Sequence, residues 1–369
     1  MKGNGAIPRL PLLTPMEFDA DEPPNSVVEG LVWDGVTHVL AGASKAGKSL
    51  FALQLMMAVC SGETFLGLPT ALSPVLLVSL ELSAGALRRR AEAISAATDL
   101  PMPAIGSRFH VAAPTRSHAL TLDLTKAAGL AALRGAIEET GARLVGLDTL
   151  YRFLPGLDPS SNADMGKAFG DLNELAQATG AGLLLLDHTS KGENLGPTSH
   201  AAIGAQVKGG ASAAVISLRR TSREDGGRWQ VDVDSWFGSW DEPLYYERPK
   251  LHDGTRGAGC VRCTASEAFG LPLERVRALF ADRGERDEKG RAFFPSKARL
   301  IEALTAEKLA SGNADGAEVI KAIQRDYSAP AGARVVYGKP IATSDGPRNA
   351  TVFTWRVSLE PMPQEEAAP

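Results

Sequence analysis

Short apolar runs alternate with helix-like segments between residues 35 and 250. The predicted strands are residues 37–41, 74–81, 108–113, 143–148, 181–188 and 212–218, and the predicted helices include residues 49–59, 127–139 and 171–179. Strands that are apolar along nearly their whole length are typical of a parallel sheet covered by helices on both faces. The pattern therefore predicts an α/β domain over residues 31–250, with residues 228–235 and 242–247 as antiparallel strands added at the edge of the sheet.

The two ends of the chain follow other patterns. Residues 1–30 are rich in proline and acidic residues and are predicted to form an N-terminal arm, and the glycine-containing residues 251–269 are predicted to be a linker. Helix-like patterns cover residues 271–282, 295–310 and 316–327, and strand-like runs follow at 333–339 and 351–357. Three helices and a β-hairpin predict a small winged-helix-like domain over residues 270–358. A disordered tail is expected at residues 359–369.

Composition and charge narrow the class of protein. The chain is 44% hydrophobic with a net charge of −4, which suits an ordinary globular protein and argues against a dedicated polycationic nucleic-acid binder. Its three cysteines fit a reducing compartment, and no apolar run is long enough to cross a membrane, so a cytoplasmic location is expected. Cys260 and Cys263 form a C-x-x-C pair without a second pair of ligands nearby, which predicts a coincidental spacing rather than a zinc site.

Residues 42–49 read GASKAGKS and fit the phosphate-loop pattern G-x-x-x-x-G-K-[ST], between a predicted strand and a predicted helix. Glycines allow backbone conformations that a β-carbon would obstruct, so successive N–H groups can surround a phosphate at the helix start. Lys48 is predicted to reach the β- and γ-phosphates of ATP, and Ser49 to hold Mg²⁺. The predicted nucleotide-binding residues are Gly42, Ala43, Ser44, Lys45, Ala46, Gly47, Lys48 and Ser49.

Three other predicted strands end on a charged or titratable side chain. Asp148 is predicted to bind Mg²⁺, and Glu81 to polarise the attacking water if its strand neighbours the phosphate-loop strand. His188 is predicted to contact the γ-phosphate or a water, because ligands bind at the carboxyl edge of open α/β sheets. Each residue also has an ordinary alternative: a helix cap for Asp148, a solvated carboxylate for Glu81 and a structural histidine for His188.

At these residues the chain resembles the RepA-like hexameric replicative helicases, an AAA_25-type group of RecA-fold P-loop ATPases. The resemblance covers about residues 25–250 and is carried by GASKAGKS, VSLE, LVGLD followed by TLYRF, and LLLLDHTSKG. It implies a RecA-like P-loop NTPase core with a central, mostly parallel sheet, in which Glu81 is the general base. It also implies a homo-oligomer, a hexameric ring that hydrolyses ATP with Mg²⁺ at subunit interfaces and translocates on single-stranded DNA.

The resemblance further implies an arginine finger from a neighbouring subunit and loops that line the DNA path. In residues 231–240, where a basic residue is expected, the chain has Ser235 and Trp236. The finger candidates are Arg219, Arg220 and Arg223. The candidates for DNA contact are Lys167, Lys191 and Lys208 in the two loops and Lys321, Arg325 and Arg348 in the winged-helix-like domain. That domain has the alternative role of docking a replication partner.

Two other functions stay open at this point. One is a RecA/RadA-like recombination or repair ATPase. The other is a nucleotide-dependent switch that binds DNA or a partner and hydrolyses slowly. The lack of a basic residue in residues 231–240 favours the switch, and Glu81 favours an active hydrolase, because a pure binding switch needs no residue that positions water.

Overall fold

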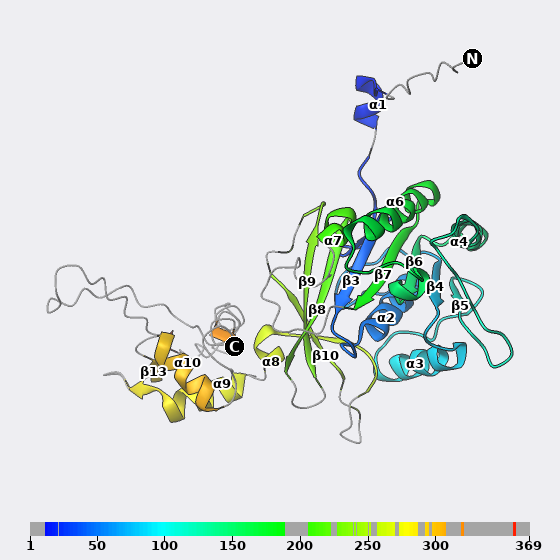
Figure 1. Ribbon diagram of the computed structural model, residues 1–369. Coiled ribbons are helices and arrows are strands. Elements are labelled where there is room, and N and C mark those ends of the chain that lie inside the picture. Colours follow the sequence, from blue (N-terminus) through cyan, green and yellow to red (C-terminus); the bar gives the residue numbers. More distant parts are fainter. Residues whose placement is uncertain are drawn as a thin grey trace, which may run out of the picture.

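The computed structural model describes residues 12–20, 22–188, 206–222, 227–238, 240, 242–249, 251, 257–269, 273–286, 292–294, 297–307, 319–320 and 357–358. In this part of the chain the main feature is a nine-stranded sheet with the strand order β11-β10-β9-β8-β3-β7-β6-β4-β5 (Figure 1). The strands from β8 to β5 in this order are parallel, and β9, β10 and β11 are antiparallel additions. The predicted α/β class with a mostly parallel central sheet is confirmed.

The parallel strands lie close to their predicted positions. They are β3 (Thr37–Gly42), β4 (Val75–Ser79), β5 (Phe109–Ala112), β6 (Leu144–Asp148), β7 (Gly182–His188) and β8 (Ala214–Ser222). The antiparallel strands β9 (Arg228–Ser235) and β10 (Leu244–Glu247) also match the prediction. Every residue of β3, β4 and β6 is buried, which explains why these strands read as continuous apolar runs.

Helices cover both faces of the sheet (Figure 1). One face packs against α2 (Lys48–Ser61) and α3 (Ala84–Ala97). The other packs against α4 (Ala127–Thr140), α5 (Leu150–Phe153) and α6 (Asn162–Thr179), with α7 (Gln206–Ala211) beside α6. The pattern predicted α2 and α4 closely, but α6 begins nine residues earlier than expected, with Ser161 as its N-cap. Among the described residues, no helix is both long and apolar enough to cross a membrane.

Helix α2 is buried around almost its whole circumference. Its residues from Phe51 to Cys60 are all buried, because the helix lies between the sheet and the segments that cover it. A β-carbon at Gly146 of β6 would lie 2.9 Å from the sulfur of Met56, so glycine at this position lets α2 pack close to the sheet. This packing brings the first residues of α2 to the edge of β6.

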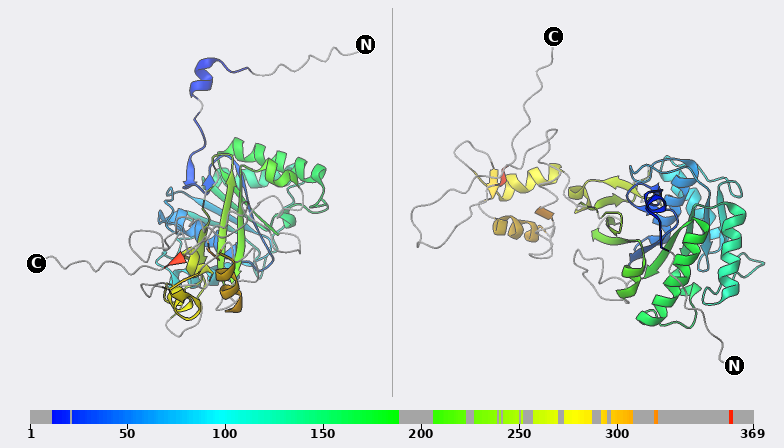
Figure 2. Two further views of the ribbon diagram at one scale, coloured as in Figure 1. Left: turned by 90° about the vertical axis from the view of Figure 1, so that its left-hand side faces the viewer. Right: turned by 90° about the horizontal axis from the view of Figure 1, so that it is seen from above.

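The predicted N-terminal arm is too long. The short strands β1 (Ser26–Val28) and β2 (Val32–Trp33) pair with each other, and Val27 and Val28 are fully buried in the core. Of the described elements before residue 30, α1 (Pro15–Ala20) lies away from the sheet (Figure 2). The acidic and proline-rich composition concealed the apolar dipeptide that anchors this segment.

The predicted linker at residues 251–269 is also corrected. Strand β11 (Val261–Cys263) pairs with β10, and the short helix α8 (Ala265–Ala268) follows it. The buried Gln54 side chain of α2 donates to the Cys260 carbonyl at 2.8 Å and accepts from the Cys260 N–H at 2.6 Å. Residues 257–269 therefore belong to the α/β domain. Among the described residues, no cluster of three or more metal-ligating His, Cys, Asp or Glu side chains is present.

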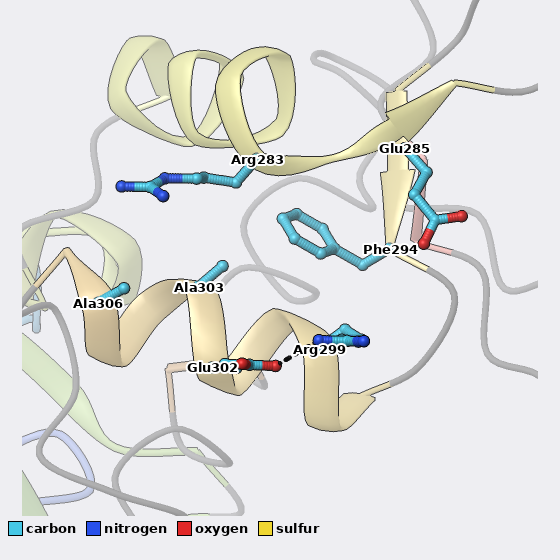
Figure 3. Close-up of a pocket in the computed structure, with 7 residues that line it drawn as sticks. All are labelled: Arg283, Glu285, Phe294, Arg299, Glu302, Ala303 and Ala306. Carbon is cyan, nitrogen blue, oxygen red and sulfur yellow. Dashed lines mark hydrogen bonds and ion pairs between the residues drawn. The ribbon is translucent and has the colours of Figure 1, made fainter.

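The described C-terminal elements only partly match the expected winged-helix pattern. Helices α9 (Leu273–Arg283) and α10 (Lys297–Ala306) lie where two helices were predicted. Strands β12 (Glu285–Arg286), β13 (Ala292–Phe294) and β14 (Val357–Ser358) form a small antiparallel sheet. A cavity of about 280 Å³ between these helices and strands is lined by Phe294 and by charged side chains that include Arg283 and Glu302 (Figure 3). The predicted third helix and the predicted wing fall largely outside the described residues, so the winged-helix assignment stays a prediction.

Candidate nucleotide-binding site

The candidate site lies at the carboxyl edge of the four central strands β3, β7, β6 and β4 (Figure 1). Side chains alternate between the two faces of a strand. Leu184 and Leu186 pack in the α2 cluster, so His188 extends from β7 toward the face that carries α2. By the same alternation, Leu144 in the α2 cluster places Asp148 on this face. The alternation of side chains along β7 and β6 therefore places His188 and Asp148 on the face where α2 begins.

The phosphate loop joins β3 to α2 as predicted. Gly47, the residue before the helix, has φ of 95°, a left-handed conformation that glycine adopts without steric cost. At Gly42 a β-carbon would lie 3.1 Å from the Leu218 carbonyl of the neighbouring β8, so a larger residue would crowd the two strands. Steric constraints thus explain why both positions of the motif carry glycine. The N–H groups at the start of α2 are available to a phosphate.

Lys48 lies inside the loop, and its ammonium group has three contacts. Its Nζ donates to the carbonyls of Gly42 at 2.7 Å and Ala43 at 3.0 Å, and lies 3.1 Å from His188 Nδ1. Burial lowers the pKa of Lys48 to about 8, although the nearby carboxylates of Asp187, Asp148 and Glu81 oppose this shift. A lysine with a lowered pKa at a phosphate-binding loop gains from an anionic ligand, which favours its charged form.

Asp148 and Ser49 fit a magnesium site. The Asp148 side chain is buried, and burial raises its pKa, whereas a hydrogen bond from Ser49 lowers it. Its Oδ1 atom is buried and has no hydrogen-bond partner within the protein. A buried carboxylate oxygen without a partner is costly, and a hard cation or its bound water removes that cost. Asp148 and the Ser49 hydroxyl are therefore the residues that would hold Mg²⁺.

Glu81 lies on the same edge of the sheet, but its strand has different neighbours from those predicted. Strand β4 neighbours β6 and β5, not β3, so the condition that its strand adjoins the phosphate-loop strand is wrong. Glu81 instead lies two residues beyond the end of β4, where its Oε2 accepts a hydrogen bond of 3.1 Å from the Thr149 hydroxyl. Its side chain is exposed, as a residue that contacts an incoming water must be.

His188 makes direct contact with the phosphate loop. Its register partner on β3 is Gly42, the first residue of the loop. Because an ammonium group only donates, His188 Nδ1 accepts from Lys48 and is unprotonated. Burial and the positive charge of Lys48 lower the pKa of His188, so the neutral ring is favoured. The Tyr151 ring lies 6.3 Å from the imidazole, between centroids.

Several residues of the site were not predicted from the sequence. Thr149 is buried directly after Asp148 and orients Glu81. Asp187 precedes His188 and forms a buried ion pair with Lys208 at 2.8 Å. Arg90, on α3, influences the Asp148 carboxylate electrostatically. Thr149 and Asp187 each adjoin a predicted site residue, which was the available signal, whereas nothing in the sequence connects Arg90 to the site.

The arginine-finger candidates that the structure describes have contacts inside the chain. Arg219 donates to the side chain of Gln230, and the Arg220 guanidinium lies 5.8 Å from the centre of the Trp229 ring. Both arginines follow Leu218, the register partner of Gly42, so they lie at the same edge as the phosphate loop. Arg223 lies outside the described residues.

The DNA-contact candidates differ in exposure. Lys167 is exposed on α6. Lys208 is 3% exposed and paired with Asp187, so the predicted phosphate contact does not fit its position. The others, Lys191, Lys321, Arg325 and Arg348, lie outside the described residues.

The assembled edge contains the groups that a nucleoside triphosphate hydrolase needs. A lysine and helical N–H groups can bind phosphates, a hydroxyl and a carboxylate can hold a divalent cation, and an exposed carboxylate can position water. The neutral His188 adds a group that can report on the terminal phosphate.

The part of the chain that carries this site matches a known protein family. The family model AAA_25, described as an AAA domain, matches residues 9–194, which include the phosphate loop and all five predicted catalytic or metal-binding side chains. Among solved structures, a KaiC-like protein, PH0186, from the hyperthermophilic archaeon Pyrococcus horikoshii OT3 has 14% sequence identity to this chain. That match covers 64% of this chain and 93% of the archaeal chain, with a TM-score of 0.45.

Proposed function

The chain belongs to the AAA_25 family of AAA domains and is a P-loop ATPase of RecA-like type, and from this premise we propose that it is an ATP-dependent DNA motor. In this proposal it is a RepA-like replicative helicase that hydrolyses ATP at the interfaces of a hexameric ring and translocates on single-stranded DNA. The observation that supports it best is the direct contact between Lys48 and His188. Lys48 is the proposed phosphate ligand, and the chain continues from His188 into the segment 189–205, which contains the DNA-contact candidate Lys191.

The proposed hydrolysis step uses this chain's residues as follows. Lys48 leaves its carbonyl partners in the loop and binds the β- and γ-phosphates, which is favourable because its charge is poorly solvated where it lies. Ser49 and Asp148 would hold Mg²⁺, which when bound would supply positive charge against the phosphates. Glu81, held by Thr149, orients a water toward the γ-phosphate and accepts its proton. His188 loses its contact with Lys48 and becomes available to the γ-phosphate.

The proposed coupling between ATP hydrolysis and DNA contact depends on the position of His188 at the end of β7. A change at its ring on loss of the γ-phosphate is transmitted to the residues that follow it in the chain. In this proposal, segments after β6 and β7 contact the DNA backbone, and Lys167 and Lys191 supply sequence-independent, salt-sensitive contacts. The arginine finger comes from Arg219, Arg220 or Arg223 of a neighbouring subunit, which requires the contacts of Arg219 and Arg220 to rearrange on assembly.

The experiment that tests the motor is unwinding of a fluorescently labelled forked DNA duplex with ATP and Mg²⁺. We expect unwinding by the wild-type chain and none by the Glu81→Gln variant at equal ATP occupancy. ATP turnover without unwinding would overturn the helicase proposal. Strand pairing without unwinding would indicate a recombination or repair ATPase instead.

A second candidate function is a nucleotide-dependent binding switch with slow hydrolysis. The observation that favours it is that Arg219 and Arg220 contact Gln230 and Trp229 within their own chain. In a switch these arginines would keep such contacts, and turnover would be slow and independent of DNA. Measuring ATP turnover with and without single-stranded DNA separates the two, because a motor is stimulated by DNA and this switch is not.

A further inference from the structure

A buried ion pair lies next to the nucleotide site and has no part in the hydrolysis step. Lys208 Nζ on α7 lies 2.8 Å from Asp187 Oδ2 on β7, and the two side chains are 3% and 8% exposed. Removing two charges from water costs free energy that their mutual attraction offsets only in part. A buried pair of this kind is therefore weak evidence for stability alone, and its other contacts indicate what it does.

The second oxygen of Asp187 is bonded to the chain at His188. Asp187 Oδ1 accepts from the backbone N–H of His188 at 2.9 Å. Leu183 and Leu185 pack on the α6 face of the sheet, so Asp187 points to that face, and His188 points to the α2 face. The carboxylate on one side of the sheet thus fixes the backbone from which the imidazole extends on the other side.

The same hydrogen-bonded path continues in both directions. On the α2 face, His188 Nδ1 accepts from Lys48. On the opposite face, the Ser212 hydroxyl donates to the Lys208 carbonyl at 2.7 Å, and Asn173 of α6 donates to the Ala211 carbonyl at 2.8 Å. Ser212 and α6 thus hold the helix that carries Lys208, while the Lys208 side chain holds Asp187. On the α2 face the contacts end at Lys48, the phosphate-binding lysine.

We propose that Lys208 is a positioning residue for recognition of the γ-phosphate: through Asp187 it holds His188 in the place from which His188 distinguishes ATP from ADP. This inference rests on the proposed role of His188 at the γ-phosphate. It replaces the predicted DNA contact of Lys208 with a role on the interior of the domain. Lys208 never meets the nucleotide, so its effect depends entirely on the presence of His188.

The test is a double-mutant cycle on the preference for ATP over ADP, measured with Mg²⁺ and without DNA. Dissociation constants are measured by displacement of a fluorescent nucleotide with ADP and with a non-hydrolysable ATP analogue. His188→Ala and Lys208→Met are each expected to reduce the preference by about tenfold, the size expected for loss of a hydrogen bond to a charged group. In the His188→Ala background, Lys208→Met is expected to have no further effect. A general loss of stability weakens both nucleotides equally and leaves their ratio unchanged.

Two further variants complete the experiment. Lys126→Met removes the lysine of an exposed ion pair, with Asp123 at 2.8 Å, and is expected to keep the full preference. If Lys208→Met alone does not fold, Asp187→Asn/Lys208→Met removes both charges, leaves no unpaired buried ion, and is used in the same cycle with the same expected loss.

Each contrary outcome overturns a different statement. An unchanged preference in Lys208→Met, or an additive effect in the His188→Ala background, overturns the role of Lys208 while His188 keeps its own. An unchanged preference in His188→Ala overturns the proposed sensor and, with it, this inference. Failure of the wild-type chain to bind either nucleotide would overturn the proposed function itself.

Discussion

At the scale of residues, the site depends on the hydrogen-bond partners of each reactive side chain. Lys48 is held by two loop carbonyls and His188, and Glu81 is held by the Thr149 hydroxyl. Asp148 keeps one oxygen unpartnered within the protein. Asp148 and Glu81 are thus placed before a nucleotide arrives, which reduces the cost of arranging them during reaction, whereas Lys48 and His188 exchange their mutual contact for the phosphates.

The pair of Glu81 and Thr149 leads to the first prediction. Glu81→Gln should lower the rate constant for ATP hydrolysis by about a hundredfold or more while ATP binding is preserved, because the amide cannot accept the proton of the attacking water. Thr149→Val should lower it by about tenfold, because Glu81 loses the group that orients it. Thr140→Val, which removes a similar hydroxyl at the end of α4, is the control and should keep wild-type turnover. Normal turnover in Glu81→Gln would show that the general base is another residue.

The lowered pKa of Lys48 leads to a second prediction. Because this pKa is about 8 in the nucleotide-free protein, Lys48 is charged at pH 7 and largely neutral at pH 9. A bound nucleotide favours the charged form, so its affinity should fall by about tenfold between pH 7 and pH 9. Titration with a fluorescent ATP analogue measures this change. Lys48→Ala should bind weakly at both pH values, and an equally steep pH dependence in that variant would assign the effect to another group.

At the scale of elements, alternation along the strands decides which face each side chain occupies. His188 and Asp148 share the α2 face, whereas Asp187 lies on the face of α6 and α7. The close packing of α2 on Gly146 then brings Lys48 and Ser49 to the strand ends. Further buried contacts join neighbouring elements. One of these contacts involves the titratable side chain of His38.

His38 on β3 connects β2 and β7. Its Nε2 accepts from the Trp33 backbone at 3.0 Å, and its Nδ1 lies 3.3 Å from the Leu183 carbonyl. Burial lowers the pKa of His38 from 6.5 to about 4, so folding favours the neutral ring. The unfolded chain takes up a proton below pH 6.5, and stability should therefore fall by about 3 kcal/mol as the pH drops from 6.5 to 4.

Denaturant unfolding at several pH values tests the third prediction. His38→Gln should be less stable than the wild type at pH 7 but should lose less stability on acidification. His118→Gln, at an exposed position, is the control and should follow the wild-type pH dependence. A wild-type pH dependence in His38→Gln would assign the acid sensitivity to other groups.

At the scale of the whole molecule, the ATP site occupies one edge of a single sheet, and the proposed ring would place a neighbouring subunit against it. The basic residues Arg219 and Arg220 lie in β8, beyond Leu218, at this same edge. On α1, which lies away from the sheet, the side chains of Met16 and Phe18 are 79% and 70% exposed (Figure 2). In the proposed ring, both features would be available to a neighbouring subunit once the arginines exchange their contacts within the chain.

The fourth prediction concerns this assembly. With a non-hydrolysable ATP analogue, Mg²⁺ and single-stranded DNA, the chain should form closed hexameric rings in negative-stain microscopy, and Lys48→Ala should form fewer of them because it binds nucleotide weakly. Mass determination in solution by light scattering checks the subunit number. Filaments would support the recombination ATPase, and a dimer would support the binding switch.

The local sequence determined much of the ATPase domain. Predominantly apolar runs predicted β3 to β8 because strands covered on both faces have few polar positions. The phosphate loop was predictable because its glycines and lysine lie close together in the chain. Strand ends marked Asp148 and His188, since polar residues after an apolar run must lie at a sheet edge. Residues 26–28 and 257–269 were not predicted because each contributes only a short strand and is anchored by a distant segment: Val28 bridges to Thr70, and Cys260 bonds to Gln54.

Only the tertiary structure decided which side chains act together. Strand order placed β7 and β6 between β3 and β4, so Glu81 reaches the site beside Thr149 and not beside the phosphate loop. Burial turned Lys208 from a predicted DNA contact into the partner of Asp187, because the charge of a lysine says nothing about its exposure. Chain periodicity reports which face a side chain occupies, whereas contacts between distant segments depend on the order and packing of the elements.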